Sequence, residues 1–426
     1  MFKVSNFKNQ TILLFIIFLG FVPSPYAIDT GILALNLDRV FLGALTIASA
    51  VFFLNKKFFS VSFLHLILIS YLGFSILNNF MLGDLQLMSL YTIVMLIALT
   101  MQEIKYETLS KGLKISFIGY AAWSVYGILY FYIFGPLTQL PLASLLPDFF
   151  IKDLGHAEEV ANFYNIFPRI SFPFGTPPVL SALGAMFFLF FLQQLDFQNK
   201  FLSKKSPLPI YGIIFSLFII LITVSKTGIA IIVCGLLVRF ILSLSWRINT
   251  KLVLFSVLAL IIFSYLMLLA LTNIDQSPIA RFIFQRLFQN SEDFDPNYVG
   301  GHLYIRILGA QHFLSLSIFN MLFGIGYLNI DGLHYHSSLL TALLETGLIG
   351  FGLFLYLLLL PILKSIDLIF NPSSLQYFHR ARYIVSSSVC IIVAHIVYEM
   401  PYVQFLWIFW AFHLKEAIFI SSHGKS

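Results

Sequence analysis

The chain has 426 residues, of which 59% are hydrophobic and only 10% are charged, and its mean hydropathy is +0.90. Soluble domains carry roughly a quarter charged residues, so this composition excludes a soluble enzyme, a nucleic-acid-binding protein and a disordered chain. Most of the cations behind the net charge of +6 lie in short segments between apolar runs, which is where membrane topology is encoded. Because apolar runs of about 20 residues recur, the sequence predicts an all-α, polytopic integral membrane protein.

The apolar runs predict about twelve transmembrane helices in a single membrane domain, residues 1–426. The predicted spans lie at about 10–27, 34–54, 58–79, 84–102, 112–135, 178–195, 208–225, 228–246, 252–272, 338–363, 383–400 and 402–420. We interpret the first as an uncleaved helix, because the site before Ile28 is a poor match to a signal-peptide cleavage site. Aromatic runs at 187–191 and 402–410 are expected to face lipid or the membrane interface.

The positive-inside rule gives one consistent orientation, with both termini in the cytoplasm. Two long segments then lie on the opposite, extracytoplasmic face, at 136–177 and at 273–337, the second between the ninth and tenth helices. Loops longer than roughly 15 residues in a compact protein are usually functional. Their semi-apolar stretches at 279–288 and 302–319 are predicted to form interfacial or re-entrant helices.

Cations near this outer face are few, so each of them carries information about function. They are Arg169, Lys226, Arg281, Arg286 and Arg306, accompanied by His302, His334 and His336. Arginine donates paired hydrogen bonds that match phosphate oxygens, so the set suits a lipid-linked pyrophosphate. The alternative is that these side chains extend to lipid headgroups at helix ends. Because five cations share one face, we favour binding of an anionic substrate.

The most regular spacing in the chain follows Gly324-Ile325-Gly326. It consists of His336-Ser337, nine residues, Gly347, two residues and Gly350. At about 100° per residue, His336, Gly347 and Gly350 would share one face of a continuous helix, with Glu345 near the opposite face. Glycines on a helix face let a neighbouring helix approach closely, so Gly347 and Gly350 are predicted to be packing residues.

This arrangement resembles the C-terminal motif of the O-antigen ligase and Wzy-type polymerase superfamily. That motif is His, then Asn, Ser or Gln, nine residues, Gly, two residues, and Gly or a substitute. Further similar pieces occur in the family's order: Arg169 before Gly175-Thr176-Pro177-Pro178, Ser225-Lys226-Thr227-Gly228, and Arg306 followed by Leu322-Phe323-Gly324-Ile325-Gly326. The resemblance covers roughly residues 165–360. The sequence departs from the family pattern at Lys226, where many relatives have arginine. Lysine keeps the positive charge but lacks the planar set of N–H donors of arginine.

The resemblance implies a GT-C-like fold and transfer of a glycan from an undecaprenyl-pyrophosphate carrier to a sugar hydroxyl. The transfer is expected to proceed with inversion and without a metal or other cofactor. His336 is expected to act on the acceptor hydroxyl, with His334 as the second choice, while Arg169 and Arg306 stabilise the leaving pyrophosphate. The expected substrate-binding residues are Arg281, Arg286, Lys226, His334 and Ser337.

The resemblance also implies a location and partners. It places the chain in the bacterial cytoplasmic (inner) membrane, with the active site on the periplasmic or extracellular face. The implied partners are an undecaprenyl-pyrophosphate-linked oligosaccharide, the lipid bilayer, a chain-length regulator and a flippase. No nucleic acid is expected.

Three alternatives stay open from the sequence. A ligase of the same fold would move the finished glycan onto lipid A-core, and we favour the polymerase because the first long loop is sizeable and no soluble domain suggests a protein acceptor. A lipid-linked oligosaccharide transporter would carry ionisable groups near the bilayer midplane, where the sequence offers little besides Glu345 and His395. A metal held by His334 and His336 needs carboxylates, and Asp331 is the only near one.

Overall fold

The computed structural model describes residues 27–29, 34–36, 73, 106–134, 177–201, 206–223, 225–244, 301–326, 337–370, 372, 374–397 and 404–423. Within them, a short antiparallel hairpin pairs β1 (Ala27–Asp29) with β2 (Ala34–Asn36). The hairpin differs from the prediction, since residues 34–36 were expected to open a helix. A short apolar stretch does not by itself distinguish strand from helix.

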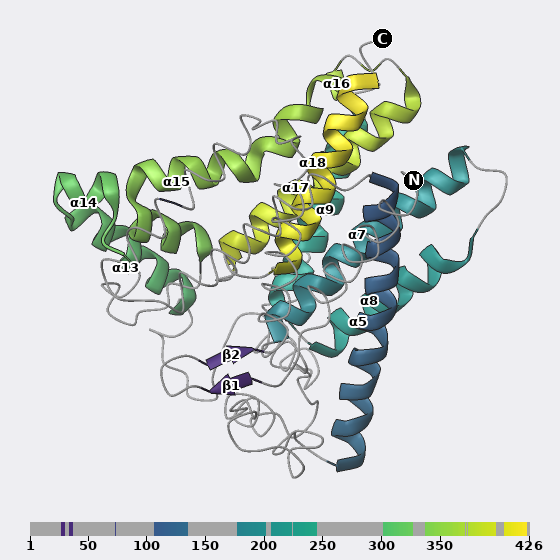
Figure 1. Cartoon of the computed structure of the whole chain (residues 1–426), viewed down its shortest axis with the longest axis horizontal. Helices are drawn as coiled ribbons and strands as arrows, with labels where there is room; N and C mark the ends of the chain where they lie inside the picture. The colour runs from purple at the N-terminus through teal and green to yellow at the C-terminus, as the bar shows by residue number, and fades with distance from the viewer. Residues whose placement is uncertain are drawn as a thin grey trace, which may run out of the picture.

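The rest of the described secondary structure is helical. The helices are α5 (Tyr106–Phe134), α7 (Pro177–Phe201), α8 (Leu208–Thr223), α9 (Lys226–Leu244), α13 (Gly301–Ser315), α14 (Ile318–Phe323), α15 (Ser338–Ser365), α16 (Asp367–Phe370), α17 (Leu375–Val397) and α18 (Gln404–His423). α15, α17 and α18 pack against one another, and α17 also packs against α9 and α7 (Figure 1). The helix predicted within 302–319 is present as α13, followed by the short α14.

Four of the described helical stretches are long and apolar enough to cross a membrane. They are Pro178–Phe201, Ser338–Phe370, Leu375–Val397 and Phe405–Ser422, with mean hydropathies between 1.2 and 2.2. The shorter α8 and α9 are also apolar. The described residues are therefore consistent with an all-α membrane protein. The predicted spans at 10–27, 34–54, 58–79, 84–102 and 252–272 lie almost wholly outside the described residues, so the number of twelve stays a prediction.

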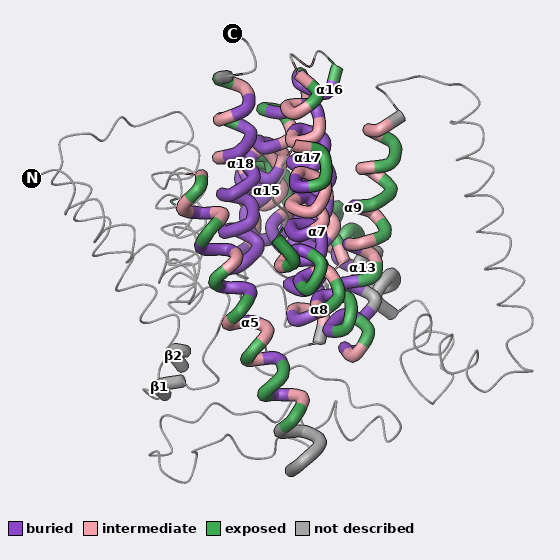
Figure 2. Tube along the Cα trace, turned by 90° about the vertical axis from the view of Figure 1, so that its right-hand side faces the viewer, coloured by how far each residue is buried: buried purple, intermediate pink, exposed green. Residues whose placement is uncertain are grey.

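The exposed surface of α8 and α9 is apolar, and Figure 2 shows these helices exposed along one side. The exposed large side chains on them are Ile210, Tyr211, Ile214, Leu217, Phe218, Leu221, Ile229, Val233, Leu236, Leu237, Phe240 and Ile241. Their spacing of three and four residues makes one continuous stripe on each helix. Such stripes are stable against lipid tails and would be costly in water.

Aromatic side chains form much of the core, which corrects the expectation that the runs at 187–191 and 402–410 face lipid. Residues 187–191 and the described part of the second run, 405–410, are all buried. The Phe187 and Phe409 ring centroids lie 5.4 Å apart in an edge-to-face arrangement. Core and lipid are equally apolar, so side-chain type does not reveal which of the two a membrane helix faces.

A hydrogen bond between α15 and α18 compensates for a proline within α15. Pro361 has no backbone N–H, so the Leu357 carbonyl four residues earlier loses its helical donor. The Trp410 indole Nε1 donates to this carbonyl at 2.7 Å. The proline and the tryptophan thus form a matched pair that links the two helices.

We expect Trp410→Phe to lower the free energy of unfolding by about 1–3 kcal/mol, because it leaves a buried carbonyl without a donor. In a Pro361→Ala background the helix supplies its own donor, so the same substitution should cost clearly less. Thermal unfolding of the four proteins in detergent gives this double-mutant cycle. Equal costs in both backgrounds would show that the indole acts only through packing.

Candidate functional site

Helix α15 is broken at Gly347, one of the two motif glycines. Gly347 has φ 63° and ψ −171°, a backbone conformation that essentially only glycine adopts. The break leaves the preceding carbonyls without their usual donors from the next turn. Segments before and after Gly347 are therefore two helical pieces rather than one rod, which differs from the continuous helix that the sequence analysis assumed.

The loop after α14 supplies the missing donors. Ile325 N–H donates to the Leu344 carbonyl at 2.9 Å, and Gly326 N–H donates to the Glu345 carbonyl at 3.1 Å. In an unbroken helix these two carbonyls would accept from residues 348 and 349. The Gly324-Ile325-Gly326 segment and the break at Gly347 are thus joined by backbone hydrogen bonds, although they lie about twenty residues apart in sequence.

Both sides of this contact require glycine. Gly324 has φ 83°, and a Cβ there would overlap the Glu345 carbonyl. A Cβ on Gly347 would overlap the Leu322 backbone at the end of α14. Gly347 thus permits the close approach of a short helix and its loop, and it does so through a positive φ. Gly350 is also buried within α15.

The start of α15 changes the geometry expected for the motif histidine. The helix begins at Ser338, and Ser337 precedes it as the N-cap in an extended conformation, with only 6% of its surface exposed. His336 lies outside the described residues. Because the helix begins at Ser338 and is broken at Gly347, the prediction that His336, Gly347 and Gly350 share one face of a continuous helix is wrong.

The helices that follow two further sequence motifs are in contact near their starts. Gly175-Thr176-Pro177-Pro178 leads into α7, and Ser225-Lys226-Thr227-Gly228 leads into α9. The two helix starts are in contact, because a Cβ on Gly228 would overlap the Ser181 side chain of α7. Ser181 and Ser225 are buried, and among the described residues neither hydroxyl has a hydrogen-bond partner.

The structure locates only some of the predicted site residues. Arg306 lies in α13 and Lys226 is the first residue of α9, but neither side chain is described. Arg169, Arg281, Arg286, His334 and His336 lie outside the described residues. The described geometry therefore concerns the backbone that surrounds the motif. Within that part of the chain, no group of three or more metal-ligating side chains is present.

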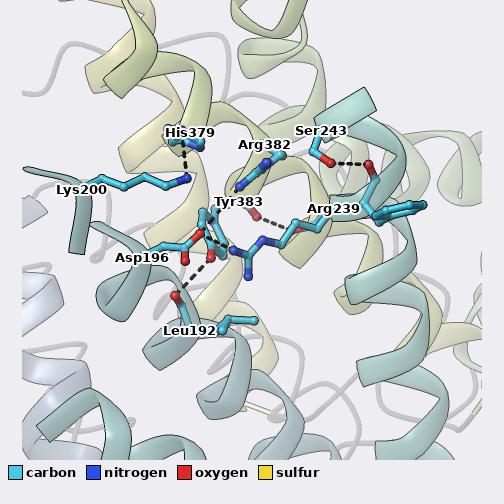
Figure 3. Close-up of polar contacts among 10 residues, drawn as sticks. Leu192, Asp196, Lys200, Arg239, Ser243, His379, Arg382 and Tyr383 are labelled. Carbon is cyan, nitrogen blue, oxygen red and sulfur yellow. Dashed lines mark hydrogen bonds and ion pairs between the residues drawn. The ribbon is translucent and has the colours of Figure 1, made fainter. Parts of the chain in front are cut away.

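A charged cluster that the sequence analysis missed links α7, α9 and α17 (Figure 3). Asp196 forms ion pairs with Arg239 and, at 3.7 Å, with Arg382. The Arg239 guanidinium also lies 4.4 Å from the Tyr383 ring centroid, and the Tyr383 hydroxyl donates to the Leu192 carbonyl at 3.1 Å. The prediction began the eleventh helix at 383, because the preceding cations suggested a loop. In fact α17 begins at Leu375, since Asp196 and aromatic rings accommodate those cations.

We expect Asp196→Asn to lower the stability by about 1–3 kcal/mol, because it leaves two largely buried guanidinium groups without their carboxylate. Asp367→Asn is the matched control, since the Asp367 side chain is exposed and has no ion pair with the described residues. Thermal unfolding in detergent should show a lower midpoint for Asp196→Asn only. Equal shifts in the two variants would contradict a structural role for the cluster.

Another polar group lies inside the bundle around Glu416 of α18. The Glu416 carboxylate accepts hydrogen bonds from Gln193 Nε2 at 3.0 and 3.1 Å and from the Tyr106 hydroxyl at 3.1 Å. His413, one turn earlier, is buried as well. Glu416 and His413 are thus buried ionisable groups that the sequence analysis did not single out, close to the end of the span predicted at 402–420.

Comparison with known sequences does not extend the resemblance. No protein-family model matches the chain, and no curated protein matches it significantly.

Proposed function

We propose that the chain is a GT-C-type glycosyltransferase that polymerises a bacterial surface polysaccharide such as O-antigen, capsule or exopolysaccharide. The donor is a glycan on undecaprenyl pyrophosphate, and the acceptor is a sugar hydroxyl of a second lipid-linked repeat unit. The active site lies on the extracytoplasmic face of the inner membrane, and both termini lie in the cytoplasm. A chain-length regulator and a flippase are the implied partners.

One structural observation supports this proposal beside the sequence motif. The Gly324-Ile325-Gly326 segment donates backbone hydrogen bonds to α15 just before its break at Gly347. The Gly324-Ile325-Gly326 segment and the α15 segment around Gly347, which both contribute to the resemblance, therefore form one structural unit. Ser337 is the buried N-cap of the same helix, so the serine of the motif belongs to this unit as well.

The proposed reaction forms one glycosidic bond for each bond to the carrier that breaks. The acceptor hydroxyl oxygen attacks the anomeric carbon from the face opposite the pyrophosphate, so the configuration inverts. The bond between this carbon and the phosphate oxygen breaks, and undecaprenyl pyrophosphate leaves with the electron pair. His336 takes the hydroxyl proton, and Arg169 and Arg306 stabilise the negative charge on the leaving group.

We expect Arg169→Ala and Arg306→Ala each to lower kcat/KM for the donor about 10²–10³-fold, because each removes a charge-assisted contact to a developing anion. Arg306→Lys keeps the charge but loses the planar fork, so it should retain an intermediate rate. Steady-state kinetics with purified variants measures both effects. If both alanine variants keep wild-type kinetics, the pyrophosphate is bound elsewhere.

A polymerase and a ligase differ in the acceptor that they use. An assay with purified protein and a defined acceptor therefore distinguishes the two activities. The protein receives only the undecaprenyl-pyrophosphate repeat unit of its host, in buffer with EDTA, and the products are separated on a gel. A ladder with a spacing of one repeat is the expected result. Transfer only after addition of lipid A-core would assign the ligase. Activity that EDTA abolishes and a divalent cation restores would instead favour a metal at His334 and His336.

A further inference from the structure

A polar hollow lies where α5, α7, α17 and α18 meet, away from the motif segment described above. It encloses about 760 Å³, including space that is open to the surroundings. Three cations line it, namely Lys111 and Lys114 of α5 and Arg380 of α17. Lys111 is exposed, whereas Lys114 and Arg380 are half-buried. The hollow therefore has a positively charged side that is accessible from the surface.

The cations of the hollow are not paired within the described part of the protein. There, neither Lys111, Lys114 nor Arg380 forms a hydrogen bond or ion pair. The Arg380 guanidinium lies 4.9 Å from the Phe197 ring centroid and 5.8 Å from that of Tyr106. These rings hold its position without occupying its N–H donors, which remain free to bind an anion.

Two carboxylates also line the hollow, and Glu416 interacts electrostatically with Arg380, but no ion pair is formed with the three cations within the described residues. Glu416 is fully buried and already accepts hydrogen bonds from Gln193 and Tyr106. Glu107 is exposed in the first turn of α5. Three cations against two carboxylates leave the lining with a net positive charge.

The surface next to the hollow changes from charged to apolar along α5. Lys111 and Lys114 are followed by Ile115 and Ile118, whose side chains are 40% and 58% exposed. A phospholipid is complementary to this surface, because its anionic phosphate group is followed by apolar acyl chains. Basic pockets between transmembrane helices bind anionic lipid headgroups in this way.

We propose that this hollow binds the phosphate group of an anionic membrane phospholipid, with Lys111, Lys114 and Arg380 as the anion-binding residues. The acyl chains then lie against the apolar surface of α5. The cations belong to segments that the charge distribution assigns to the cytoplasmic side, so the lipid would come from the inner leaflet. The inference does not depend on the glycosyltransferase proposal, because it uses none of the motif residues.

Native mass spectrometry of the full-length protein in detergent tests this inference. Phosphatidylglycerol, phosphatidylethanolamine and phosphatidylcholine are titrated separately, and inorganic phosphate is then added as a competitor. The test variant is Lys111→Gln with Lys114→Gln, which removes both positive charges and keeps polar side chains. Lys364→Gln is the matched control, because Lys364 is exposed in the last turn of α15 and does not line the hollow.

We expect wild-type protein to retain phosphatidylglycerol in preference to the two zwitterionic lipids. The double variant should bind it about tenfold more weakly, and Lys364→Gln should bind it like wild type. Equal phosphatidylglycerol binding by wild type and double variant would overturn the proposal, as would equal binding of all three lipids. Displacement of the lipid by an equal concentration of inorganic phosphate would also overturn it in favour of a soluble anion. If the double variant does not fold, Lys111→Gln alone tests the same prediction, because Lys111 is exposed.

Discussion

His336→Ala is expected to lower the turnover number by about 10²–10⁴-fold, the usual contribution of a general base, and so to reduce transfer to the background level. The neutral imidazole accepts the proton of the acceptor hydroxyl, and alanine offers no acceptor in its place. The donor is bound through other residues, so KM for the lipid-linked glycan should change little. Initial rates with purified protein give both constants.

Two further variants separate the proposed base from a positioning group. His336→Gln can still hydrogen-bond to the acceptor but cannot take its proton, so its turnover should be as low as that of the alanine variant. His334→Ala tests the neighbouring histidine and should retain most of the activity. Wild-type turnover in His336→Ala would remove His336 from the mechanism, and a loss in His334→Ala alone would transfer the role to His334.

Gly347→Ala is expected to lower the free energy of unfolding by about 2–4 kcal/mol, an effect that combines backbone strain with a steric clash. A side chain disfavours the observed positive φ, and the added Cβ would overlap the Leu322 backbone. Relief of the clash would separate α14 from α15 and weaken the hydrogen bonds from Ile325 and Gly326. The thermal unfolding midpoint and the transfer rate should therefore fall together.

Gly352→Ala is the matched control within the same helix. A Cβ at Gly352 would meet no atom within 4 Å, and its backbone conformation is helical. Alanine favours the helix over glycine by about 1 kcal/mol, so this variant should be as stable as wild type or slightly more stable. If Gly347→Ala and Gly352→Ala had the same midpoint, Gly347 would not be a required break.

The sequence predicted several helices close to their observed bounds, because long apolar runs with polar ends define membrane helices well. The run predicted at 178–195 corresponds to α7, and that at 338–363 corresponds to α15. The predicted helix bounds are wrong where charged side chains lie within a helix and are paired inside the protein. α17 begins eight residues before the predicted 383, where Ser374 caps its first turn, and Arg382 within this added part pairs with Asp196 from a distant helix. No local pattern reveals such a partner.

The backbone geometry around the motif could not be predicted from the sequence, and the roles of the site residues stay predictions. The spacing of Gly347 and Gly350 suggested helix packing, but a glycine in an apolar run can also be required for a positive φ, as at Gly347. Only the three-dimensional contact with Gly324 and Leu322 distinguishes these uses. The buried group around Glu416 was also missed, because Gln193 and Tyr106 are distant in sequence.

The most direct test of the proposed chemistry is to measure the carrier released by purified protein in liposomes that contain a labelled undecaprenyl-pyrophosphate repeat unit. Glycosyl transfer predicts that one undecaprenyl pyrophosphate appears for each glycosidic bond formed, and that none appears with His336→Ala. Transport predicts that the donor crosses the bilayer intact. An intact donor on the far side, without released carrier, would contradict the assignment as a glycosyltransferase.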